Sequence, residues 1–144
     1  MKNVKYIIFS VFILCLLNGC VDPISITQIK IVNKSSYDLH ISFYPYPEEA
    51  DMGKLPSDKW NNDFDLLKNK SVSFELHYSM TLEPRDPNYQ IEKALFLNMN
   101  DNEEIKEYNN DNHKLFKLTG TEDNSIYGGK KVSFLLEIDA DLLK

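Results

Sequence analysis

The 144-residue sequence predicts an all-β fold, a single antiparallel β-sandwich of about seven short strands with no disulfide bond. Apolar and polar residues alternate in several segments of strand length, which is the pattern of a strand with one buried face. Pro, Gly, Asn and Asp gather between these segments, as they do in turns. No long segment has the period of an amphipathic helix, so the crossover helices of a parallel sheet are missing.

The first two strands are predicted on either side of a turn at 33–36, whose Asn and Ser side chains hydrogen-bond to nearby backbone groups. Residues 24–31 carry four isoleucines, with an interruption near Gln28. Residues 37–43 alternate without a break, because each apolar residue is followed by Asp, His or Ser. This regular alternation is a strong signal for a half-buried strand.

Residues 45–70 are predicted to form a long loop, because three prolines and one glycine interrupt the segment between positions 45 and 56. Ser57 could cap one helical turn, but the two adjacent asparagines that follow weaken a longer helix. The loop separates the first two strands from the rest of the sandwich.

The later strands follow the same alternating pattern. A clear strand covers 72–78, and two prolines in the next segment predict an exposed connection. An Asn- and Asp-rich turn after 93–99 predicts a hairpin. The remaining predicted strands are 104–108, 114–120 ending at Gly120, and 132–140.

The N-terminal segment is predicted to leave the protein. Lys2 and Lys5 precede an apolar run at 6–17, and twelve helical residues span only about 18 Å of a hydrocarbon core about 30 Å thick. The ending Leu17-Asn18-Gly19-Cys20 resembles the lipobox of bacterial lipoproteins. In that family the cysteine is acylated and the preceding peptide is removed. An ordinary signal peptide or a core helix is the alternative.

This resemblance divides the chain into three parts: a signal peptide (1–19), a lipidated tether (20–25) and a β-sandwich domain (26–144). Cleavage removes two of the 16 basic and none of the 22 acidic residues, which leaves a formal charge of −8. Cys15 leaves with the signal and Cys20 carries lipid, so no thiol remains for a disulfide, a thiolate nucleophile or a metal site. The negative charge argues against binding of nucleic acid.

No catalytic residue, metal site or cofactor is predicted, and the protein is not expected to be an enzyme, because no nucleophile or paired carboxylate stands in a known motif. His40 and His77 lie on polar strand faces, where they could converge on a metal. The run 98–104 has oxygen side chains two apart, but it lacks the glycine and the bidentate glutamate of a calcium loop. Solvated histidines and a solvated hairpin tip are the interpretations we favour.

The candidate binding residues are aromatic and lie in or beside the long loop. Amphipathic rings on loops of a rigid sandwich can stack on sugars or anchor a protein partner. The interpretation we favour is that Trp60 and Phe64 fold back to cover one end of the core, because a loop this long must bury something to stay ordered. The candidates are Tyr44, Tyr46, Trp60 and Phe64.

Taken whole, the chain resembles small lipoproteins of Bacteroides-type bacteria. The resemblance rests on the segments 17–20, 29–43, 69–79, 94–108 and 132–143. It implies an immunoglobulin-like β-sandwich, in the sense of architecture, anchored in the outer membrane through lipid at Cys20. The function we expect is a non-catalytic envelope lipoprotein that binds a protein partner or serves envelope assembly. The alternative is a surface glycan-binding accessory lipoprotein that uses the loop aromatics.

The lipobox makes a direct prediction. Cys20→Ser should lose all incorporation of a clickable palmitate analogue, because the acylated thiol is removed. Cys15→Ser is the matched control and should label as the wild type does. In-gel fluorescence of the protein from labelled bacterial cells measures both, and persistent label on Cys20→Ser would contradict the lipidation.

Overall fold

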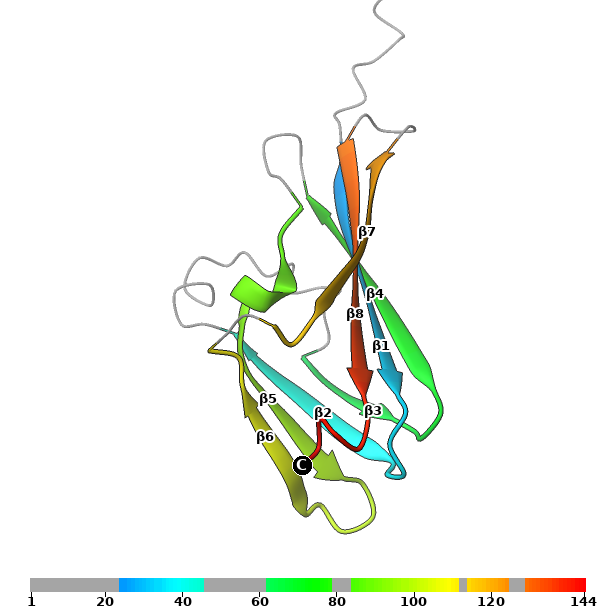
Figure 1. Ribbon diagram of the computed structural model, residues 1–144, viewed down its shortest axis with the longest axis vertical. Helices are drawn as coiled ribbons and strands as arrows, with labels where there is room; N and C mark the ends of the chain where they lie inside the picture. Colours follow the sequence, from blue (N-terminus) through cyan, green and yellow to red (C-terminus); the bar gives the residue numbers. More distant parts are fainter. Residues whose placement is uncertain (1–23, 46–61, 79–83, 112–113, 125–128) are drawn as a thin grey trace, which may run out of the picture.

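The computed structural model describes residues 24–45, 62–78, 84–111, 114–124 and 129–144, which form two four-stranded sheets packed face to face (Figure 1). The predicted all-β sandwich is therefore confirmed. Sheet A has the order β4 (Ser71–Tyr78), β1 (Ser25–Asn33), β8 (Gly129–Ile138) and β7 (Lys117–Asn124). Sheet B has the order β3 (Asp63–Leu66), β2 (Leu39–Pro45), β5 (Ile91–Asn98) and β6 (Glu104–Asn109).

The strand count differs from the sequence prediction because β3 lies inside the predicted loop 45–70. Its four residues alternate, with Phe64 and Leu66 toward the core and Asp63 and Asp65 toward solvent. A four-residue alternation beside several prolines is too short to stand out in the sequence. Eight strands are therefore described instead of about seven.

The direction of one strand pair also differs from the prediction. β1 and β8 pair in parallel, whereas every other strand pair among the described residues is antiparallel. Alternation reports which face of a strand is buried, and it carries no information about the direction of the neighbouring strand. β7 also continues past Gly120 to Asn124, with a register shift between Leu118 and Gly120.

The core lies between the two sheets, as the alternating pattern predicts. The strands place every second side chain inward, and the inward apolar side chains are almost completely removed from solvent. Within the described parts of the chain, no helix is long and apolar enough to cross a bilayer. The strands contribute Ile29, Ile31, Leu39, Ile41, Phe43, Leu66, Leu76, Ile91, Ala94, Phe96, Phe134, Leu136 and Ile138 to this core.

A buried asparagine at the end of β1 ties the two sheets together. The Asn33 side-chain amide donates hydrogen bonds to the carbonyl oxygens of Tyr37 (2.8 Å) and Leu66 (2.9 Å). Its Oδ1 accepts from the backbone N–H and the hydroxyl of Ser35 (3.0 and 2.7 Å). The Asn33 N–H donates to the carbonyl of Lys70 (2.9 Å). The β1–β2 and β3–β4 connections therefore share one fixed point.

Two further buried asparagines, Asn88 and Asn110, form hydrogen bonds at the opposite end of the sandwich. Asn88 follows Pro87 in the short 3-10 helix η1 (Pro87–Tyr89), and its side chain exchanges two hydrogen bonds with the Phe116 backbone (2.6 and 2.7 Å). Asn110 Nδ2 donates to the carbonyls of Asn88 (2.9 Å) and Ile91 (3.0 Å). The described part of the predicted exposed connection is thus largely buried, because these amides satisfy its backbone groups.

Asn33→Ala should lower the free energy of unfolding by roughly 2 to 4 kcal/mol, because buried carbonyl and N–H groups lose their partners. Urea denaturation of the protein followed by circular dichroism measures the change. The control is Asn109→Ala on the exposed face of β6, which should change stability by less than about 0.5 kcal/mol. Equal effects of the two substitutions would show that the Asn33 contacts do not hold the fold.

Candidate functional site

The two described aromatic candidates lie on opposite faces of sheet B. Tyr44 is 42% exposed on the outer face, where the Lys93 ammonium lies 4.8 Å from the ring centroid. Phe64 lies on the inner face, with ring centroids 6.0 Å from Phe43 and 5.3 Å from Phe74. Phe64 therefore packs against the core, as the favoured interpretation of this residue held, and of these two described rings Tyr44 is the exposed one.

The other candidates of the sequence analysis lie outside the described residues. These are Tyr46 and Trp60 in the loop and Cys20 in the tether. Binding by the four aromatic residues and lipidation of Cys20 stay predictions. Close to the described ends of the loop, the Phe43 N–H donates a hydrogen bond to the Asn62 carbonyl (2.7 Å).

A charged network on the outer face of sheet B was not anticipated from the sequence. His40 in β2 lies between two aspartates of β3, with Nδ1 2.7 Å from Asp65 Oδ1 and Nε2 2.8 Å from Asp63 Oδ1. The Ser42 hydroxyl donates to Asp63 at 2.6 Å. The register pairs His40 with Asp65 and Ser42 with Asp63, so the network follows directly from the β2–β3 pairing.

The network favours a charged imidazole. The hydrogen bond with Asp65 is the main cause that raises the pKa of His40 above its ordinary value of 6.5, and the negative charges of both aspartates add to it. Partial burial acts in the opposite direction. Both ring nitrogens face carboxylates, and the Ser42 hydroxyl donates to Asp63 rather than to the imidazole. The arrangement therefore holds charge in place and does not activate the serine as a nucleophile.

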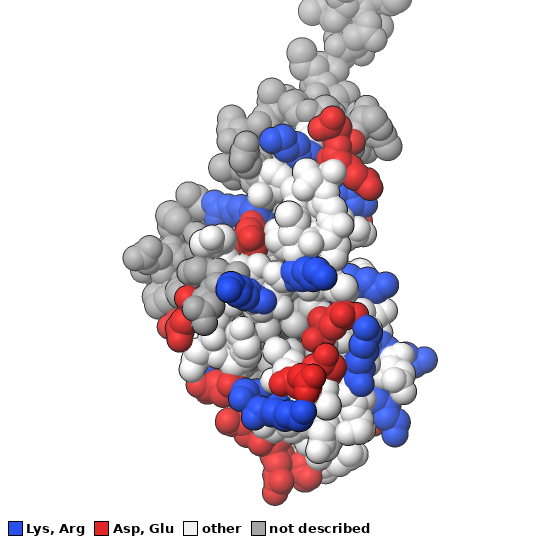
Figure 2. Space-filling view, viewed as in Figure 1, with Lys and Arg blue, Asp and Glu red and all other residues white. Residues whose placement is uncertain are grey.

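The structure shows how the residues of the two candidate metal sites, the histidine pair and the run 98–104, are arranged. His40 and His77 lie in different sheets, so they do not converge. In the β5–β6 turn, Asn98 Oδ1 accepts from the Asn100 N–H (3.1 Å), and Asn102 closes the turn with a φ of 57°. Acidic side chains gather over this turn at the lower end of Figure 2. Among the described residues, no group of three or more His, Asp or Glu side chains is arranged to hold a metal ion.

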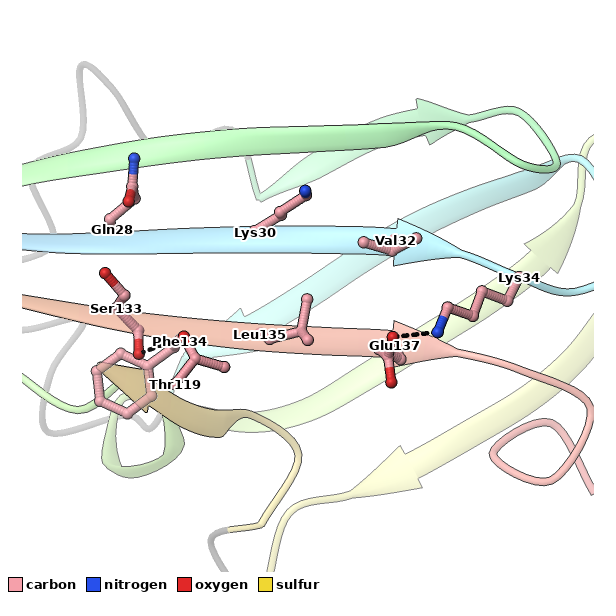
Figure 3. A pocket seen from close by; sticks show the side chains of 9 residues that line it. All are labelled: Gln28, Lys30, Val32, Lys34, Thr119, Ser133, Phe134, Leu135 and Glu137. Atoms are coloured by element: carbon pink, nitrogen blue, oxygen red, sulfur yellow. Dashed lines mark hydrogen bonds and ion pairs between the residues drawn. The ribbon is translucent and has the colours of Figure 1, made fainter.

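Two shallow grooves open on the outer faces of the sheets. The groove on sheet B has a volume of about 290 Å³ and lies between His40, Asp65 and the aliphatic side chains of Leu97 and Met99. The groove on sheet A has a volume of about 330 Å³ and runs along β1 and β8 (Figure 3). Its side chains include Gln28, Lys30 and Val32 from β1 and Ser133, Leu135 and Glu137 from β8.

Comparison with protein-family models, with curated proteins and with solved structures finds no match for this chain.

The His40 network predicts a pH dependence with a definite sign. Because the folded pKa is raised, the stabilisation by His40 is present below about pH 6.5 and is lost as pH rises through the folded value. Asp65→Asn should lower the His40 titration midpoint measured by NMR, and should cost more stability at pH 6 than at pH 8.5. Glu75→Gln, beside the exposed His77, is the control and should leave the His40 midpoint unchanged.

Proposed function

We propose that the protein is a non-catalytic binding module, tethered by lipid at Cys20 to a membrane of the bacterial cell envelope, with the outer membrane as its location. The observation that carries the proposal is the pair of grooves on the outer sheet faces, each with half-buried aliphatic side chains and a charged border. Apolar centres with polar borders are typical of protein-binding surfaces. A module of this kind serves as a docking point for an envelope protein.

The position of the tether supports this arrangement. β1 begins at Ser25, five residues after Cys20, and five extended residues span at most about 18 Å. A lipid on Cys20 would therefore hold the start of β1 close to the membrane surface. The turn that follows Asn33, at the other end of β1, and the β5–β6 turn at the lower end of Figure 1 would lie away from the membrane, and the outer faces of both sheets would be open to partners from the side.

Glycan binding is the second candidate, and Tyr44 favours it. An exposed ring can stack on the apolar face of a sugar. Lys93 already lies near this ring and also contacts Glu107 (3.2 Å), so a sugar would have to displace a side chain that makes two favourable contacts. The inward position of Phe64 removes a second ring from the same surface. Protein binding therefore ranks first.

Site-specific photocrosslinking in intact cells tests the proposed function. A photoreactive residue at Ser73 reports on the face of sheet A, one at Glu104 reports on the face of sheet B, and one at Leu67 in an exposed turn is the control. At least one face should give a discrete protein adduct, and Cys20→Ser should reduce it, because the tether raises the local concentration of an envelope partner. Absence of adducts from both faces in the anchored protein would contradict the proposal.

A separate experiment tests the glycan alternative. If Tyr44 stacks on a sugar, wild-type protein should bind members of a glycan array and Tyr44→Ala should lose that signal. We expect no binding that depends on Tyr44, and a signal lost in this variant would place glycan binding first.

A further inference from the structure

We propose that the groove on the outer face of sheet A is the docking site for an extended acidic peptide segment of a partner protein, with an aliphatic side chain between its carboxylates. This inference rests on the proposed binding function and adds to it the surface used and the chemistry of the partner. Three features of the groove support it: its shape, its apolar floor and its free positive charge.

The shape follows from the register of three strands. Ser133 in β8 pairs with Gln28 on one side and with Gly120 on the other. A Cβ at Gly120 would meet no heavy atom within 4 Å, so open space lies beside the small side chain of Ser133 on the β7 side. The taller Leu135 stands in the next outward row of β8. The side chains that line the groove follow one another along β1 and β8 (Figure 3), so the groove extends along the strands.

The floor of the groove is aliphatic. Val32 and Leu135 are half-buried on the solvent side of β1 and β8, and none of the strands that the structure describes covers them. The ion pair between Lys34 and Glu137 lies at one end of the groove (Figure 3). Phe134 also borders the groove but is only 5% exposed, so it offers no ring face for a sugar. An aliphatic side chain of a peptide fits such a floor better than a sugar does.

Charge selects an acidic partner. Lys30 lines the groove, and Lys117 pairs in register with Leu135 from the other side, so one lysine lies on each side of the strand position that holds Leu135. Within the part of the chain that the structure describes, neither lysine has an ion-pair partner. In sheet B, by contrast, Lys93 and His40 are already paired with carboxylates. Carboxylates on both sides of an aliphatic residue would complement the two lysines.

The extended form of the partner follows from the length of the groove. The lining side chains run from Gln28 in β1 to Lys34, the residue after β1, and six steps of extended chain span about 20 Å. In an extended chain, alternate side chains point to the same side at a similar spacing. A peptide with an aliphatic residue between acidic ones can therefore place its carboxylates near the lysines and its aliphatic side chain over Val32 and Leu135.

The test uses the full-length protein purified in detergent and two synthetic probes of nine residues, one rich in Glu and Leu and one with Lys in place of every Glu. Fluorescence anisotropy at low salt should show binding of the acidic probe only. The double variant Lys30→Glu, Lys117→Glu should weaken binding at least tenfold. The matched variant Lys68→Glu, Lys114→Glu, which has the same net charge, should stay within about twofold of wild type, because both lysines lie outside the groove.

Gly120→Leu provides an independent variant that leaves the charges unchanged. A Cβ at Gly120 would meet no heavy atom within 4 Å, and Gly120 pairs with the groove residue Ser133, so a leucine at this position is expected to extend over the edge of the groove. Binding should then fall while the unfolding transition is preserved. Equal weakening by the two double variants, or full binding by Gly120→Leu, would overturn the assignment.

Vesicles of phosphatidylcholine with a quarter phosphatidylglycerol test a lipid surface as the ligand. If the protein binds these vesicles through Lys30 and Lys117 and does not bind the acidic peptide, the groove is assigned to a lipid surface instead.

The outcomes also separate this inference from the proposed function. Crosslinks in cells from Glu104 but none from Ser73 would retain a binding module and refute docking on sheet A. Crosslinks from Ser73 that are lost in the double variant Lys30→Glu, Lys117→Glu would support both. Absence of adducts from either face would contradict the proposed function itself.

Discussion

The side-chain amide of Asn33 is the contact on which the alignment of the two sheets depends. A strand that slips by one residue turns its whole apolar face toward solvent, so a sandwich needs a device that fixes register. Asn33 supplies it, because its hydrogen bonds reach the turn before β2 and the end of β3, while its backbone bonds to the start of β4. Asn88 and Asn110 have the same role at the other end of the sandwich.

Both outer surfaces depend on this register. Lys30 and Lys117 flank Leu135 only because β1 and β7 pair with β8 as they do. On the other sheet, His40 meets Asp65 because β2 and β3 are aligned residue for residue. The same pairing that buries Ile41 and Phe64 therefore arranges the charges outside. The docking surface that we propose needs no special loop, since a rigid sheet already holds the side chains at fixed distances.

The sequence predicted the candidate site only in part. It singled out Tyr44, whose ring is exposed, and Phe64, whose ring packs inward against Phe43 and Phe74. The alternation of Asp63 and Asp65 with apolar neighbours was the one signal that could have revealed β3 and the partners of His40. The sheet A groove has no local signature, because its lysines are 87 positions apart in the chain and meet beside a residue of a third strand.

The sequence by itself determined the all-β class, most strand positions and which face of each strand is buried, since these follow from the alternation of side chains along one strand. Only the tertiary structure decided that β1 and β8 run in parallel, that β3 joins sheet B, and that His40 contacts Asp63 and Asp65 rather than His77. The physical reason is the range of the interactions. Alternation is a property of neighbouring residues, whereas strand order and direction depend on packing between segments that are distant in the chain.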